Sequence, residues 1–157
     1  MSSIFPEQQG AREPDLDHLR RARELGPQLE AAAEEIERRR ELPEAIVEAL
    51  IERGLFGLLL PRTLDGAELR PAAYVAVIEE VAKHDASVAW CLGQACGCTM
   101  TSAHLDPAVA SEIFGGKRGI VAWGPPGPAE ARAVPGGPHA TIPRFPPKIS
   151  LATAGSR

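Results

Sequence analysis

The sequence predicts a mainly α-helical domain that extends to about residue 116. Apolar side chains recur at three- and four-residue intervals through most of this stretch, which places them on one face of successive helices. Residues that commonly begin or end helices, such as Pro71 and Gly54, stand at the edges of these intervals. A chain of 157 residues is long enough for one complete hydrophobic core.

The first expected helix covers about residues 16–40. Its apolar stripe consists of Leu16, Leu19, Ala22, Leu25, Leu29, Ala32, Ala33 and Ile36. Pro27 lies inside this stretch, and a proline in a helix interior removes one backbone hydrogen bond. One long bent helix and two short helices are both compatible with the pattern.

A second helix is expected to begin at Pro43 and to end at Gly54, which can adopt the left-handed conformation of a C-terminal cap. Pro71 begins a third helix, and Asp85 or Ser87 can cap a fourth over residues 88–105. We expect six of the apolar side chains on these helices to be buried: Ile46, Leu50, Val77, Val81, Trp90 and Leu92.

The last expected elements are a short helix and one strand. Asp106 and Pro107 begin the helix, which Gly115 and Gly116 end. The run "GIVAW" at 119–123 is typical of a strand.

Composition limits the classes of function. The chain carries 17 basic and 21 acidic residues, a net charge of −4, so it has no excess of positive charge for nucleic acid or an anionic membrane surface. Its longest apolar run, residues 54–60, is too short to span a bilayer, and its N-terminus lacks the features of a signal peptide. Three cysteines within eight positions do not form a disulfide framework. We therefore expect a cytoplasmic protein whose partners are small molecules or other proteins.

No catalytic or metal-binding constellation is predicted. The stretch "FGGKRG" at 114–119 lacks the first glycine and the final hydroxyl residue of a phosphate-binding loop, so a helix cap and a solvated turn are the better interpretation. Cys96 and Cys98 lie on different faces of one helix, which disfavours a metal site with Cys91 and His104. A nucleophile pair of Cys91 and His84 lacks an orienting third group.

The fourth expected helix leaves one binding surface open. Its small residues Gly93, Ala95, Gly97 and Thr99 would let a flat ligand approach the helix backbone closely. Tight packing against a neighbouring helix explains the same residues.

The order and the amino-acid sequences of three segments resemble the N-terminal helical domain of the acyl-CoA dehydrogenase superfamily, including its flavin-dependent monooxygenase branch. These segments are "LPEAIVEALIERGLFGLLLPRTLDGAEL", "YVAVIEEVAKHDASVAW" and "IVAWGPPGPAEARAVPGG", and the resemblance covers about residues 16–137. It implies an orthogonal helical bundle, followed by the first strand of an incomplete β-domain.

The resemblance also implies site residues. In this family the flavin lies between a middle β-domain and a C-terminal helical bundle, while the N-terminal helices wall the substrate pocket. By position, Ala122, Trp123 and Gly124 would contact FAD. Four residues would line the pocket for an acyl-CoA or aromatic substrate: Trp90, Leu92, Cys98 and Thr99. Many relatives of the monooxygenase branch carry a His near the place of Cys98, and two prolines follow Gly124 here, which disfavours hydroperoxyflavin chemistry.

The composition changes near the C-terminus. No Asp or Glu follows Glu130, and prolines stand at 135, 138, 143, 146 and 147. We therefore expect four regions: a flexible N-terminus at 1–15, the helical domain at 16–117, the start of a β-domain at 118–137, and an aberrant tail at 138–157 without stable packing. The expectation is a truncated chain, inactive alone; a proline-rich segment that binds a partner domain is the alternative.

Three hypotheses on function follow. The first is a fragment of an acyl-CoA dehydrogenase-like flavoprotein, whose parent oxidises an acyl-CoA or hydroxylates an aromatic. The second is a non-catalytic helical module that binds a protein partner through an exposed apolar surface. The third is a free-standing small-molecule binder that uses the helix from Trp90 to Thr99. A homo-oligomer is left open.

Overall fold

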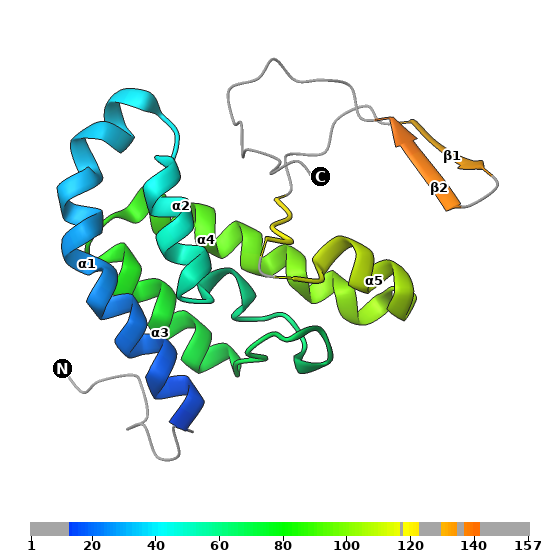
Figure 1. The fold of residues 1–157 in the computed structure, drawn as a ribbon, viewed down its shortest axis with the longest axis horizontal. Coiled ribbons are helices and arrows are strands. Elements are labelled where there is room, and N and C mark those ends of the chain that lie inside the picture. The colour runs from blue at the N-terminus through cyan, green and yellow to red at the C-terminus, as the bar shows by residue number, and fades with distance from the viewer. Residues whose placement is uncertain (1–12, 117, 123–129, 135–136, 142–157) are drawn as a thin grey trace, which may run out of the picture.

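A computed structural model of the protein describes residues 13–116, 118–122, 130–134 and 137–141. These residues form a mainly helical domain and a small β-hairpin (Figure 1). The α-helices are α1 (Glu13–Arg39), α2 (Glu44–Glu52), α3 (Pro71–Ala82), α4 (Ala86–Thr99) and α5 (Pro107–Phe114). Short 3-10 helices join them: η1 (Leu55–Gly57), η2 (Arg62–Leu64) and η3 (Met100–His104). The predicted helical class is confirmed.

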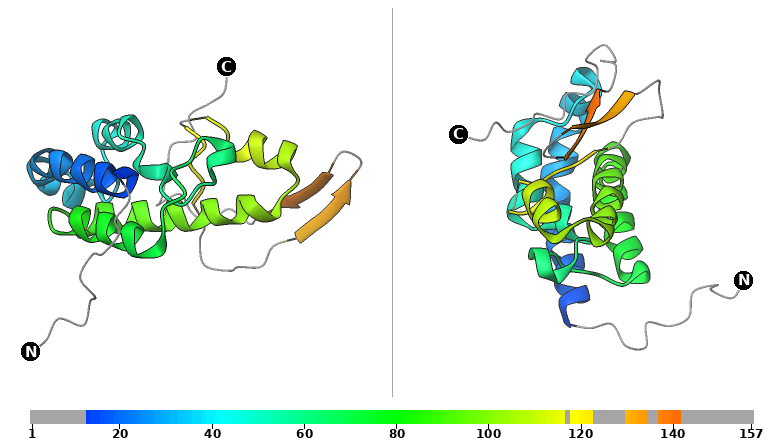
Figure 2. Two further views of the ribbon diagram at one scale, coloured as in Figure 1. Left: turned by 90° about the horizontal axis from the view of Figure 1, so that it is seen from below. Right: turned by 90° about the vertical axis from the view of Figure 1, so that its right-hand side faces the viewer.

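The helices lie in two layers. Figure 2 shows α1 and α2 above α3 and α4, with α4 extending past the other three helices toward α5. The core between the layers contains fully buried side chains from every one of these four helices, including Leu25, Leu50, Val77 and Leu92. Because α2 and α4 contribute to the same core, their relative positions are fixed by close packing.

α1 is one long helix that passes through Pro27. Gly26 lies directly against the imidazole of His84 at the end of α3: a Cβ atom at residue 26 would stand 2.4 Å from the Cε1 atom of His84. The same imidazole places its Nδ1 atom 2.7 Å from the Oε1 atom of Glu30 in α1. Because Gly26 has no side chain, α1 leaves room at this position for the imidazole of His84, which follows α3.

A buried carboxylate also joins α1 to α3. Glu80 of α3 is only 7% exposed, and its two oxygen atoms contact Arg23 Nε at 3.2 Å and Lys83 Nζ at 2.9 Å. The hydrogen bond from Lys83, together with the charge of both cations, lowers the pKa of Glu80 in spite of its burial. The carboxylate is therefore ionised and paired at neutral pH.

Three of the predicted helix caps are confirmed, whereas the fourth helix, expected to run to residue 105, ends at Thr99 and is followed by η3. Gly54, directly after the last turn of α2, has a φ angle of 69°, in the left-handed region that favours glycine. Asp85 Oδ1 accepts a hydrogen bond from the Val88 amide at 2.8 Å and begins α4. Asp106 begins α5 in the same way, through the Ala108 amide at 2.9 Å.

Of the six predictions of burial, the one for Trp90 is wrong. The other five side chains are buried, whereas the indole of Trp90 is 70% exposed. The buried residues of α4 are Val88, Ala89, Leu92, Ala95, Cys96, Cys98 and Thr99. All of these except Cys98 share one face, and residue 90 lies on the opposite side of the helix. Burial of α4 is therefore one-sided, although its sequence is apolar nearly all round.

The strand expected at 119–123 is not formed by residues 119–122. The amide of Ile120 instead donates to the carbonyl of Arg118 at 2.8 Å, in a tight turn, and the Ile120 side chain packs against the helical core. A hydrophobic contact with the domain thus replaces the strand pairing that the apolar run suggested. Trp123 lies outside the described residues.

Two strands lie further along the chain. β1 (Glu130–Val134) pairs antiparallel with β2 (Gly137–Thr141), with Glu130 opposite Thr141 and Val134 opposite Gly137. β2 crosses the boundary predicted at 137/138, so residues 138–141 pair with β1 although the prolines of the tail were expected to oppose a sheet. The expectation that the tail has no stable packing of its own stays a prediction. Pro138 is compatible with the hairpin because alternate residues of an antiparallel pair make no hydrogen bond to the partner strand. The rest of the predicted tail, residues 142–157, lies outside the described residues.

No helix in the described part of the chain is long and apolar enough to cross a membrane.

Candidate functional site

A hollow of about 390 Å³ lies between α3 and the outer face of α4. It is lined by Tyr74, Ile78, Ala86, Ala89, Trp90, Gly93 and Gln94. We call it the Trp90 groove. Its walls are mostly apolar, with the exposed indole of Trp90 on one side and the amide of Gln94 as a polar group.

Tyr74 holds the two helices of the groove together. Its hydroxyl donates a hydrogen bond of 3.2 Å to the carbonyl of Gly93. Burial raises the pKa of Tyr74, with a smaller contribution from Cys96, so the phenol keeps its proton at neutral pH and remains a donor.

The glycines of α4 leave its outer face open. A Cβ atom at Gly93 would lie 3.5 Å from the Tyr74 hydroxyl, and one at Gly97 would meet no atom within 4 Å. Residues 90, 93 and 97 follow one another at helical spacing, so they share a face of α4. Of the two interpretations of the small residues, an open approach to the backbone fits Gly97, and interior packing fits Ala95 and Thr99.

The structure brings one of the four predicted pocket residues into the groove. Trp90 lines it, whereas Leu92, Cys98 and Thr99 are buried, and Thr99 Oγ1 donates to the Cys96 carbonyl at 2.7 Å. Sequence reasoning did not identify Gln94 and Tyr74 as groove residues. Gln94 stands four positions after Trp90, and this helical spacing could have predicted that the two share a face. Tyr74 could not be predicted in this way, because it approaches α4 from another helix.

Of the three residues predicted to contact FAD, the structure describes Ala122. It is exposed and follows the Ile120 turn. Trp123 and Gly124 lie outside the described residues. Ala122 offers only backbone groups and a methyl group, which is compatible with the close backbone approach that the resemblance implies for these positions.

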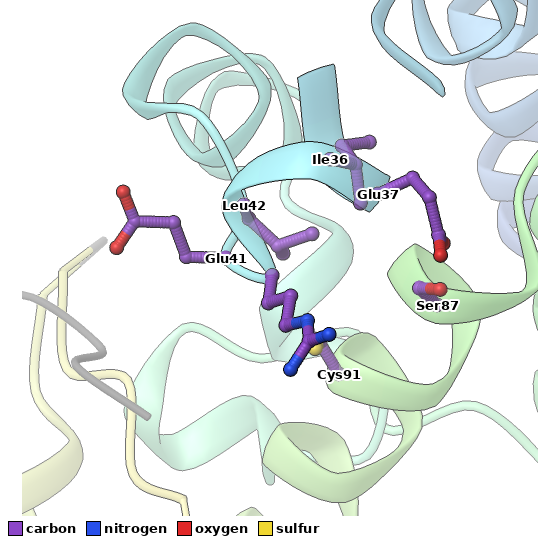
Figure 3. Close-up of a pocket in the computed structure, with 7 residues that line it drawn as sticks. Ile36, Glu37, Glu41, Leu42, Ser87 and Cys91 are labelled. Atoms are coloured by element: carbon purple, nitrogen blue, oxygen red, sulfur yellow. The ribbon is translucent and has the colours of Figure 1, made fainter. Parts of the chain in front are cut away.

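A second hollow of about 240 Å³ lies between the C-terminal end of α1 and the first turns of α4 (Figure 3). Figure 3 shows Ile36 and Leu42 from the α1 side, and Ser87 and Cys91 from α4. Burial raises the pKa of Cys91, and the nearby charge of Asp85 raises it further. Because only the thiolate is a strong nucleophile, this thiol is poorly suited to covalent catalysis. His84, its candidate base, is paired with Glu30 instead.

Cys96 and Cys98 are buried, whereas Cys91 is half-buried beside the second hollow. Burial raises the pKa of Cys96 to about 12, and its thiol donates to the carbonyl of Leu55 at 3.3 Å. No disulfide bond joins these three cysteines, all of which lie in the described residues. Within the described residues, no group of three or more His, Cys, Asp or Glu side chains is placed to hold a metal ion.

Comparison with known proteins decides the family. The sequence profile described as acyl-CoA dehydrogenase, N-terminal domain, matches residues 20–109, more than half of the chain. The chain belongs to this family. The predicted resemblance to the family is therefore confirmed. The match covers α1 from Arg20 through α4 and into α5, whereas the resemblance was expected to reach about residue 137.

A 3-(aryl)acrylate reductase from Clostridium sporogenes (strain ATCC 15579) is 33% identical to the chain over 63 residues. The aligned stretch is 40% of this chain and 17% of that protein, so the two share a small part of the relative's length. All residues of the Trp90 groove lie within the acyl-CoA dehydrogenase N-terminal domain match, whereas Arg118, Ala122 and the hairpin lie beyond it.

Proposed function

We propose that this acyl-CoA dehydrogenase N-terminal domain forms one wall of the substrate pocket of a FAD-dependent oxidoreductase. The observation that carries the proposal is the coincidence of the family match, residues 20–109, with the helices that build the Trp90 groove. Trp90 supplies an exposed aromatic face, Gln94 supplies an amide, and Gly97 leaves room for a flat molecule above the helix.

The substrate class we propose is an acyl-CoA or an aromatic acid with a planar conjugated chain. The relative from Clostridium sporogenes is named for 3-(aryl)acrylates, in which an aromatic ring is conjugated with an alkene. Such a molecule matches an exposed indole, because stacked aromatic pairs gain about 0.5–1.5 kcal/mol beyond their buried area. Oxidation of an acyl-CoA and hydroxylation of an aromatic ring both remain within this proposal.

We propose Ala122, Trp123 and Gly124 as the residues of this chain that approach FAD. When bound, the flavin would supply hydride transfer, and the residues of this chain would position it and the substrate. Trp90 and Tyr74 would shape the substrate side, and Leu92, Cys98 and Thr99 would act from the interior by holding α4 in place. Three cysteines without a disulfide bond between them are in keeping with these roles in a cytoplasmic enzyme.

Tryptophan fluorescence tests the groove directly. The chain has two tryptophans, Trp90 and Trp123, so the variants Trp90→Phe and Trp123→Phe separate their signals. We expect a cinnamoyl thioester or 3-phenylacrylate to quench wild type and Trp123→Phe, and to leave Trp90→Phe unchanged. Quenching that is lost only in Trp123→Phe would contradict the assignment of the groove.

We also propose that the 157-residue chain by itself holds flavin weakly and has no turnover. A flavin needs its ring, ribityl chain and pyrophosphate met by positioned donors, and binding must offset an association cost of roughly 4–15 kcal/mol. Titration of the purified chain with oxidised FAD, followed by absorbance, is expected to show no micromolar binding. Tight binding, or turnover of acyl-CoA thioesters, would show that the chain builds a site of its own.

A protein-binding module is a second candidate, and one observation favours it. Four apolar side chains on η3, on α5 and between them are exposed: Met100, Leu105, Val109 and Ile113. Val109 and Ile113 lie four residues apart on one face of α5. If this surface binds a second copy, wild type should self-associate in light scattering and Ile113→Asp should be monomeric. A monomeric wild type would contradict self-association.

A further inference from the structure

The chain folds back onto the helical domain after α5. Gly115 ends α5, and Gly116 has a φ angle of 81°, which turns the backbone. The amide of Gly119 then donates to the carbonyl of Gly116 at 3.3 Å. This yellow segment can be followed in Figure 1, where it leaves α5 toward α2. Residues 118–122 are therefore part of the folded domain, although they form neither helix nor strand.

An ion pair connects this segment to α2. The guanidinium of Arg118 contacts the carboxylate of Glu48 with two parallel hydrogen bonds, Nη1 to Oε1 at 2.8 Å and Nη2 to Oε2 at 2.6 Å. The two residues are 70 positions apart in the sequence. Two parallel hydrogen bonds fix the orientation of the guanidinium as well as its distance from the carboxylate, whereas a single hydrogen bond does not fix the orientation.

Two neighbouring residues reinforce the same placement. Ile120 packs against the core. Gly119 lies against the end of α5, where a Cβ atom would stand 2.8 Å from the carbonyl carbon of Phe114, so no larger residue fits without a shift. Ile120 supplies a non-directional contact, and the Glu48–Arg118 pair supplies the orientation.

The Glu48 side of the ion pair stands on a helix that is packed into the core. Glu48 is followed in α2 by Ala49 and Leu50, which are buried in the core that also contains Leu92 of α4. Arg118 is therefore held relative to α4, and so relative to the Trp90 groove.

We propose that Glu48 and Arg118 are positioning residues that set where the chain leaves the helical domain at Ala122. The inference rests on the proposed function, in which Ala122 approaches the flavin and the Trp90 groove receives the substrate. The pair would then fix the spacing between the cofactor side and the substrate side. The Arg118 side chain is 56% exposed and the Glu48 side chain 34%, so the ion pair contributes modestly and should weaken in salt.

Hydrogen exchange of the full 157-residue chain tests the pair without flavin. The variants are Glu48→Gln and Arg118→Gln, with Glu35→Gln as a matched control that removes another surface Arg–carboxylate contact of 2.8 Å, within α1. We expect amides in residues 118–122 to exchange about two- to fivefold faster in the two test variants, and the control to match wild type. The charge-swapped double variant Glu48→Arg with Arg118→Glu should restore much of the protection.

A second readout follows the position of the exit itself. In the Trp90→Phe background, Trp123 is the remaining tryptophan, next to Ala122. Its fluorescence anisotropy should fall when Glu48→Gln is added and stay unchanged with Glu35→Gln. The midpoint of thermal unfolding should move by less than about 2 °C in every variant, as for surface substitutions.

Two results would overturn the proposal. One is unchanged exchange and anisotropy in the test variants. The other is faster exchange throughout α2 with a matching loss of thermal stability, which would make the pair a general stabiliser. Failure of flavin or substrate to bind would count against the proposed function and leave the hydrogen-exchange result standing.

Discussion

Apolar and small residues have different roles on the two faces of α4. The inner face presents Leu92, Cys96 and Thr99, which are closed in by the core and have their polar groups satisfied by nearby carbonyls. The outer face presents Trp90, Gly93 and Gly97 beside open space. An apolar residue stabilises the fold on one side and is available to a ligand on the other. Substitutions on the two faces should therefore separate stability from binding.

The largest expected effect is on the inner face. Leu92→Ala removes a fully buried side chain and leaves a cavity, so it should lower the free energy of unfolding by about 2–4 kcal/mol. Trp90→Ala removes a larger side chain from the outer face and should change stability by no more than about 0.5 kcal/mol. Urea unfolding of the two variants measures the difference. Equal losses would mean that Trp90 packs against the domain in solution.

Leu50→Ala in α2 should resemble Leu92→Ala, because Leu50 is fully buried in the same core. We expect a loss of about 2–4 kcal/mol. An unchanged melting temperature would contradict the placement of α2.

The next effect concerns the buried carboxylate that joins α1 to α3. Glu80→Gln keeps the shape but removes the charge that Arg23 and Lys83 meet, and it should cost about 1–3 kcal/mol. The pKa of Glu80 is lowered in the folded state. Its contribution is therefore fully present above the pKa of the unfolded chain and is lost as pH falls through the lower folded pKa.

Unfolding measured at pH 7 and at successively lower pH values checks this sign. Wild type should lose stability toward acid more steeply than Glu80→Gln, so that the two approach each other at low pH. A constant difference between them at every pH would show that the charge of Glu80 plays no part.

The two faces of α4 also show which features of the fold can be predicted from the sequence. Helix ends such as Gly54, Asp85 and Asp106 were predictable because a cap depends on residues within one turn. The orientation of α4 was not, because a helix that is apolar nearly all round has no polar stripe to mark its outer side. Trp90 was predicted to be buried from its place in a helical pattern of apolar residues, whereas the core lies against the face of α4 that carries Leu92 and Cys96.

Long-range contacts explain the remaining differences. The run from Gly119 to Trp123 has the β-branched residues of a strand, but Arg118 binds Glu48 seventy positions away and Ile120 packs on the core. The Trp90 groove depends on Tyr74, whose hydroxyl meets the Gly93 carbonyl from another helix. The family resemblance predicted that α4 lines a substrate pocket. Which residues of α4 are exposed could be known only from the three-dimensional structure.

The substitution that should separate the two faces most sharply is Gly97→Ala, because its expected effect on stability is opposite in sign to that of Leu92→Ala. A methyl group at residue 97 meets no atom within 4 Å, and alanine is favoured over glycine in a helix interior by roughly 0.8–1 kcal/mol. The variant should therefore be slightly more stable than wild type.

The same methyl group should weaken binding of a flat ligand, since it stands on the surface that the ligand must approach. We expect the fluorescence titration with 3-phenylacrylate to show weaker quenching in Gly97→Ala, although the protein is more stable. Gly26→Ala is the matched control within a helix, because its Cβ atom would stand 2.4 Å from the His84 ring and should destabilise the fold by about 1–3 kcal/mol. If Gly97→Ala gains stability and binds the ligand as well as wild type, the outer face is open but the ligand does not use it beyond Trp90.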